Sequence, residues 1–167
     1  MLTELLPQSF KFEFGEGVIE LRYTLRSFLE LEKAGYKYTD IFEQKVTGGL
    51  IIAFFKAGLV APIEDVKIQS IAEIVGYEML WEYCLQAIMM SFPKHDDRIA
   101  QKPPSPNDEE FSFARLRTLI CDVMGKSDEF FWNSTLRELI DRWKEYAVAM
   151  GYSEEPERVL EFDEEGM

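Results

Sequence analysis

Few residues of this 167-residue chain have the side-chain types and the spacing that catalysis or ligand binding would need. The first candidate is Gly125-Lys126-Ser127, which has the order of residues found at the end of a phosphate-binding loop. That loop also needs a glycine at position 120, where the chain has Ile120 inside an apolar helical stripe. The sequence therefore predicts that Gly125 ends one helix and Ser127 caps the next turn, with no bound nucleotide.

His95 is the only histidine, and it stands beside Asp96 and Asp97. Zinc sites need about four ligands, and no further cysteine or histidine nearby completes such a set. One histidine and two separated cysteines also fail to supply a nucleophile together with its base. The carboxylates gather in polar runs, where nothing would shift their pKa values toward acid–base catalysis. We therefore expect a protein that is not an enzyme, with no catalytic residue, no cofactor and no metal.

Cys84 and Cys121 both fall among apolar neighbours in helical patterns. Buried cysteines behave as small hydrophobic residues, so the sequence predicts two buried free thiols in a reducing cytoplasm. A disulfide between them is the alternative that the sequence leaves open. The first residues lack the basic start and apolar run of a signal peptide. The apolar run 46–63 contains Lys56 and Pro62, which favours buried core over a membrane span.

The formal net charge of −13 limits the classes of partner. A phosphate backbone or an anionic membrane attracts basic surfaces, so we expect neither nucleic acid nor membrane as a partner. A DNA-binding helix–turn–helix over 114–143 is disfavoured too, because its second helix would carry charges of both signs. Three roles remain for the acidic residues: they keep the protein soluble, they bind a basic protein partner, or they imitate DNA.

The elements that would position these residues begin with a β-hairpin. Apolar and charged residues alternate over 10–14, turn residues follow, and a second strand covers 18–23. Thr24 can cap a helix over 25–34, and a second helical pattern covers 50–57. Residues 63–92 are predicted to hold one long helix that starts near Asp65, and a further segment opens at Thr39-Asp40. A Pro-rich stretch separates them from a helix over 111–124. The predicted fold class is α+β, mostly α: an N-terminal β-hairpin packed on a helical bundle, with a C-terminal helical pair after the Pro-rich linker.

This pattern divides the chain into four segments. Residues 1–92 are a hairpin-plus-helices domain, 93–110 the linker, 111–151 a C-terminal helical docking unit and 152–167 an acidic tail. Two short helices cannot bury their apolar faces alone. The docking unit must therefore pack on its own domain, on a second copy or on a partner, and a homo-oligomer stays open.

Three adjacent aromatic residues, Phe130-Phe131-Trp132, form a short elbow before the last predicted helix. Thr135 and Glu138 have the spacing of a capping box at its start, and Gly151 can end it. Its apolar stripe comprises Leu136, Leu139, Ile140, Trp143, Ala147 and Met150. Buried aromatic residues dominate binding at interfaces, while Phe131 and Trp132 could equally be core residues. The predicted partner-binding residues are Phe130, Phe131, Trp132, Leu136, Leu139 and Trp143.

The run 116–139 reads L-x-x-L-I-C-x-V-M-G-K-S-D-E-F-F-W-N-S-T-L-R-E-L. It resembles the C-terminal region of tail assembly chaperones of long-tailed bacteriophages, which often carry a pattern close to S-x-x-E-F-W-x-x-T-x-R-E-L. This chain departs from that pattern by doubling the phenylalanine at Phe130 and Phe131, and by having Leu136 where a proline is common.

The resemblance implies a protein encoded by a phage or prophage that assists tail morphogenesis without catalysis. Its partners would be the tail-tube (major tail) protein and the tape-measure protein. It would act in the cytoplasm of the bacterial host and would not be retained in the mature virion. The family often makes its long form by translational frameshifting.

The alternative function belongs to a different class, an acidic inhibitor that imitates DNA to block a host nucleic-acid-binding protein. Such a mimic needs acidic groups in two ordered rows, whereas here they gather in the predicted linker and tail. Binding by a DNA mimic would weaken steeply as salt is added, and an apolar contact would not.

Overall fold

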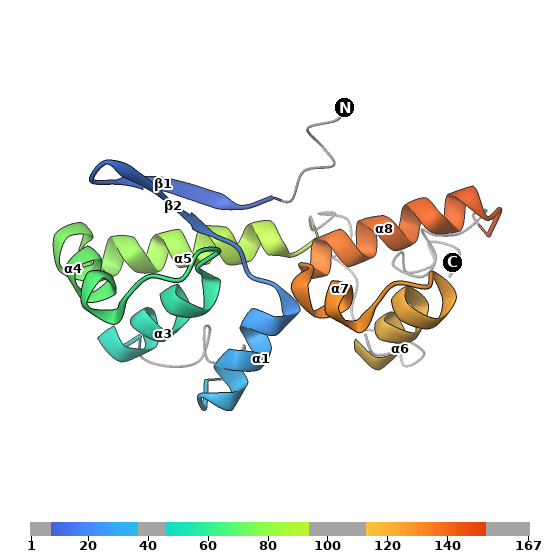
Figure 1. The fold of residues 1–167 in the computed structure, drawn as a ribbon, viewed down its shortest axis with the longest axis horizontal. Coiled ribbons are helices and arrows are strands. Elements are labelled where there is room, and N and C mark those ends of the chain that lie inside the picture. Colours follow the sequence, from blue (N-terminus) through green and yellow to red (C-terminus); the bar gives the residue numbers. More distant parts are fainter. Residues whose placement is uncertain (1–7, 37–45, 94–112, 153–167) are drawn as a thin grey trace, which may run out of the picture. The chain divides into compact units, whose positions relative to one another are not determined.

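The computed structural model describes residues 8–36, 46–93 and 113–152 (Figure 1). Contacts within the chain define two compact units, the first made of Met1–Phe92 with Trp132–Leu136 and the second of Pro93–Phe131 with Arg137–Met167. The first division falls at the end of the expected hairpin-plus-helices domain. Segment Trp132–Leu136, expected in the docking unit, belongs to the first unit instead. The predicted linker and acidic tail lie outside the described residues, apart from Pro93 and Tyr152.

The predicted fold class is confirmed: the structure is mostly helical, with an N-terminal antiparallel hairpin followed by helices. Strand β1 (Phe10–Phe14) pairs with β2 (Gly17–Leu21), and Phe14 stands opposite Gly17. Gly15, with φ of 62°, is the first residue of the two-residue turn, where a type II′ turn requires positive φ. The aromatic residues of β1 are partly buried while its charged residues are exposed, as the alternating pattern predicts.

Four helices of the first unit follow the hairpin in the described sequence: α1 (Leu25–Lys33), α3 (Gly48–Gly58), α4 (Asp65–Val75) and α5 (Tyr77–Ser91). Thr24 caps α1 as expected, through a capping box with Ser27. The prediction of one long helix over 63–92 is wrong. Gly76 adopts φ of 92° between α4 and α5, a conformation incompatible with a continuous helix, so the chain turns there. The segment opening at Thr39-Asp40 lies outside the described residues.

The core of the first unit forms around α5. Figure 1 shows the hairpin running along one side of α5 and α3 along another, and both pairs are in contact. Aromatic rings fill these interfaces: Phe12 lies 4.6 Å from Tyr83 between ring centroids, and Phe54 meets Trp81 edge-on at 5.5 Å. Such pairs contribute about 0.5–1.5 kcal/mol beyond their area burial. Within the described residues, no helix has both the length and the apolarity needed to cross a membrane.

Tyr23 is fully buried and joins three elements of this core. Its hydroxyl donates to the Phe54 carbonyl at 2.7 Å, and its backbone N–H donates to Ser91 Oγ at 3.2 Å. The ring lies so close to the end of α3 that a Cβ at Gly58 would be 2.6 Å from its Cζ. Glycine at position 58 therefore serves close packing as well as ending the helix.

We predict that Gly58→Ala lowers the free energy of unfolding by about 1–3 kcal/mol, because the added methyl group overpacks against Tyr23. Gly49→Ala is the matched control, since a Cβ there meets nothing within 4 Å. That variant should be neutral or up to about 1 kcal/mol more stable, because alanine favours helix. Urea unfolding measures both, and equal effects of the two substitutions would refute the packing argument.

Cys84 is the second titratable group in this core, beside Tyr23. Burial raises the pKa of its thiol to about 12, and a hydrogen bond with Tyr23 opposes part of that shift. The pKa of Tyr23 is also raised well above its usual value, chiefly by burial. Both groups therefore stay neutral in the folded protein at a pH where the unfolded chain begins to ionise.

The difference in thiol pKa between the folded and the unfolded chain makes stability depend on pH in one direction. The unfolded thiol loses its proton near pH 9 and the folded thiol does not, so stability falls as pH rises above about 9. Between pH 7 and pH 10, the Cys84 contribution should shrink by about 1.4 kcal/mol. We predict that the stability deficit of Cys84→Ala is smaller at pH 10 than at pH 7 by that amount, measured by urea unfolding. A deficit that does not change with pH would contradict the buried neutral thiol.

The second unit contains α6 (Phe113–Arg117), which continues into a π-helix, η3 (Thr118–Val123), and most of α7 (Asp128–Asn133) and α8 (Leu136–Ala149). The expected helix over 111–124 is thus present from Phe113 onward, with a π-helical second half. The predicted aromatic elbow is wrong, because those residues form α7. The helix ends at Gly125 and Gly151 are confirmed, with φ of 68° and 72°.

Candidate partner-binding surface

The predicted partner-binding residues separate into buried and accessible ones. Phe131 and Leu139 are buried and belong to the core in this structure. Phe130, Trp132, Leu136 and Trp143 are partly exposed. The set also belongs to different units: Trp132 and Leu136 to the first, Phe130 and Trp143 to the second.

Phe130 is held at the start of α7. Its backbone N–H donates to Ser127 Oγ at 3.1 Å, which confirms Ser127 as a cap. Lys126 Nζ lies 5.8 Å from the centre of its ring, and the Arg142 guanidinium carbon lies 5.2 Å from the same point. Cations over an aromatic face are attracted by its quadrupole. The partly exposed ring therefore lies in contact with two basic side chains.

Trp143 begins a row of three aromatic side chains. Its ring stacks on Tyr146 at 5.8 Å between centroids, and Tyr146 contacts Tyr152 at 6.4 Å. The Tyr146 hydroxyl donates to the Val123 carbonyl at 3.3 Å, which ties α8 to the end of η3. Sequence reasoning missed both tyrosines. The helical spacing of Trp143 and Tyr146 was the available signal. The contact of Tyr152 with Tyr146 depends instead on the turn at Gly151, which spacing does not predict.

The row ends in exposed apolar side chains. Tyr152 is 57 % exposed and Met150 is 52 % exposed. Together with the partly exposed rings they form what we call the client surface: Val123, Phe130, Trp143, Tyr146, Met150 and Tyr152. The backbone N–H of Met150 donates to the Tyr146 carbonyl, so the end of α8 positions both side chains. Exposed apolar side chains beside a row of aromatic rings are candidates for protein–protein contact.

Trp132 and Leu136 have a different setting, in the segment assigned to the first unit. The Leu25 N–H donates to the Ser134 carbonyl at 3.1 Å, and Arg22 Nη1 donates to the Asn133 carbonyl at 3.2 Å. These bonds attach the segment to the connection between β2 and α1. A partner-binding role for Trp132 and Leu136 stays a prediction.

The candidates for chemistry do not converge in the described structure. Among the described residues, no three of His, Cys, Asp or Glu are grouped so as to hold a metal ion. His95, Asp96 and Asp97 lie outside those residues. Both cysteines are free thiols, so the disulfide left open by the sequence is not formed. Cys84 is buried as predicted, whereas Cys121 is only partly buried.

Cys121 lies in η3 close to a charged pair. Its sulfur is 3.7 Å from Asp128 Oδ1, and Asp128 forms an ion pair with Arg117 at 2.6 Å. Desolvation raises the pKa of the Cys121 thiol, and the Asp128 carboxylate raises it further, while Arg117 lowers it. A thiol with a raised pKa carries little thiolate at neutral pH and is a weak nucleophile there.

Comparison of the chain with protein-family models, with curated protein sequences and with solved structures finds no match. The likeness to tail assembly chaperones thus depends on the motif over 116–139.

We predict that Asp128→Asn speeds the alkylation of Cys121 at pH 8, because removal of the carboxylate charge lowers the thiol pKa. Arg117→Gln should slow it, because the guanidinium favours the thiolate. Peptide mapping after a pulse of iodoacetamide measures the rate, with buried Cys84 as the internal control. Rate changes of the same sign in both variants would contradict the geometry of η3 and α7.

Proposed function

We propose that this protein is a tail assembly chaperone of a long-tailed bacteriophage or prophage. In this proposal it binds the tail-tube protein, the tape-measure protein or both during tail morphogenesis, acts in the host cytoplasm and leaves before the virion is complete. It performs no catalysis and needs no cofactor. The observation that carries the proposal beyond the sequence motif is the client surface in the second unit.

The client surface supports reversible binding of an apolar protein segment. Its aromatic rings are held in place by stacking and by the Tyr146 hydrogen bond to Val123, so little side-chain freedom would be lost on binding. Aromatic anchors contribute most of the energy at interfaces, often about 2 kcal/mol or more each. A Kd of about 1 μM corresponds to a binding free energy of about −8 kcal/mol.

Moderate affinity suits the proposed task. Tube subunits must not self-associate early, so their strand edges and apolar loops need temporary cover. They must also leave the chaperone when a growing tube offers a larger interface. A small apolar surface released without breaking covalent bonds meets both requirements. The net charge of −13 would keep chaperone and complex soluble and would speed the encounter with a basic client.

The second candidate function, a DNA-mimic inhibitor, is favoured by the same net charge of −13. Salt separates the two functions. A contact made through the client surface should keep its Kd within about threefold between about 50 and 500 mM salt, because apolar burial is little affected by screening. Affinity that falls by orders of magnitude over that range would favour the mimic.

We predict that Met150→Ser with Tyr152→Ser weakens binding to the tail-tube protein encoded by the same genome by about tenfold or more, about 1.4 kcal/mol. Both side chains are exposed, so folding should be unaffected. The matched control is Ile74→Ser with Met89→Ser, two side chains of the first unit that are 74 % and 75 % exposed. Isothermal titration calorimetry on the full chain measures both Kd values. Equal losses in the two double variants, or no loss in the first, would refute the client surface.

A further inference from the structure

The outer edge of β2 is only partly covered by its neighbouring segment. The Arg22 N–H donates to the Gly58 carbonyl at 2.7 Å, and the Val60 N–H donates to the Glu20 carbonyl at 3.0 Å. Main-chain groups alternate between the two sides of a strand, so Val18, like Glu20 and Arg22, directs its N–H and C=O away from β1. Among the described residues, no hydrogen bond reaches these groups of Val18 from beyond the hairpin.

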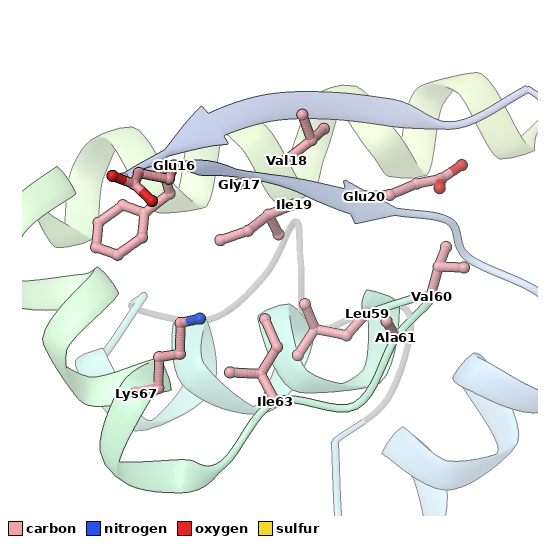
Figure 2. A pocket seen from close by; sticks show the side chains of 12 residues that line it. Glu16, Gly17, Val18, Ile19, Glu20, Leu59, Val60, Ala61, Ile63 and Lys67 are labelled. Carbon is pink, nitrogen blue, oxygen red and sulfur yellow. The ribbon is translucent and has the colours of Figure 1, made fainter.

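Pro62 explains why this pairing stops. Leu21 and Leu59 form an isolated antiparallel bridge, and the same register continued along the strands would place Pro62 opposite Val18. Proline has no N–H to donate and cannot extend the ladder. The chain therefore turns away after Val60, and Figure 2 shows the segment from Leu59 to Ile63 diverging from β2.

The divergence leaves a hollow of about 470 Å³ beneath the strand edge. Ile19, Leu59 and Ile63 line it with apolar side chains, and Glu16, Glu20 and Lys67 supply its charged groups (Figure 2). This volume falls in the range of pockets that hold small ligands or a few peptide side chains. The unused main-chain N–H and C=O of Val18 thus lie beside an apolar recess.

We propose that this edge binds an extended segment of another protein, which adds as a strand to β2 at Val18. Its main chain pairs with the Val18 N–H and C=O, and one of its alternate side chains enters the hollow between Leu59 and Ile63. Recognition of this kind draws affinity from main-chain hydrogen bonds and specificity from side-chain pockets. The proposal does not depend on the client surface or on a phage origin.

The charges define the chemistry of the added strand. Glu16, Glu20 and Lys67 line the hollow, and the Glu20 carboxylate also accepts from Ser9 Oγ and pairs with Lys11 of β1 at 3.9 Å. The whole chain carries a net charge of −13, so a second copy of the same chain would be repelled. Because the chain is strongly acidic, the edge fits a foreign segment that carries basic residues, and β-branched residues suit the extended conformation of an added strand.

The test uses a fluorescent synthetic peptide of alternating valine and threonine with a lysine at each end, titrated into the full chain and followed by anisotropy. Two forms of the peptide carry N-methyl groups on opposite alternate amides. Strand addition predicts that one methylated form loses at least tenfold in affinity while the other binds within about twofold of the parent. Equal binding of the two forms, or no binding of the parent, would overturn the proposal.

Variants of the protein test the same edge. Val18→Pro removes the outward N–H while sparing the bonds between β1 and β2, and should weaken the parent peptide at least tenfold. Val18→Thr keeps the N–H and should bind within about twofold of wild type. If circular dichroism shows that Val18→Pro does not fold, the test is the comparison of the two methylated peptides, titrated into the wild-type chain. Dimerisation that Val18→Pro abolishes would assign the edge to a second copy and overturn the proposal.

Discussion

The burial of Tyr23 is the constraint on which the first unit depends. A buried phenol must find an acceptor, and the Phe54 carbonyl of α3 supplies it, while Ser91 of α5 accepts the Tyr23 backbone N–H. The ring fits only because position 58 lacks a Cβ. Gly58 packs against the ring, and the Gly58 carbonyl accepts a hydrogen bond from the Arg22 N–H. The residues after Gly58 therefore run along the edge of β2. One packing requirement thus fixes the end of α3, the hairpin edge and the hollow beside it.

The two proposed interaction surfaces differ in their physics. The client surface offers side chains, rigidified by the stacking of Trp143 on Tyr146, and would select a partner by apolar shape. The β2 edge offers main-chain groups at Val18 and would select an extended strand. An acidic protein with one surface of each kind could cover both the apolar loops and the strand edges of a subunit awaiting assembly, which is the task proposed for a tail assembly chaperone.

Sequence patterns predicted the elements with strong local signals. The alternation over 10–14 gave the hairpin, and the caps at Thr24, Gly125 and Gly151 gave helix ends, because these depend on neighbouring residues alone. Gly76 was missed inside an apolar stripe that continues through it, since periodicity does not register a backbone turn. Of the predicted site, Phe131 and Leu139 proved to be core, and Tyr146 and Tyr152 were overlooked. A helical stripe does not show which of its residues face a neighbouring helix and which face solvent.

We propose that apolar side chains of the second unit bind a client protein without any change in covalent bonds. Hydroxyl-radical footprinting of the full chain, alone and with the tail-tube protein of the same genome, tests it directly, because oxidation reports side-chain exposure. The account predicts that Met150, Tyr152 and Trp143 are protected in the mixture, while exposed Met89 is oxidised as before. Unchanged oxidation of Met150 and Tyr152 in a mixture shown to contain the complex would contradict it.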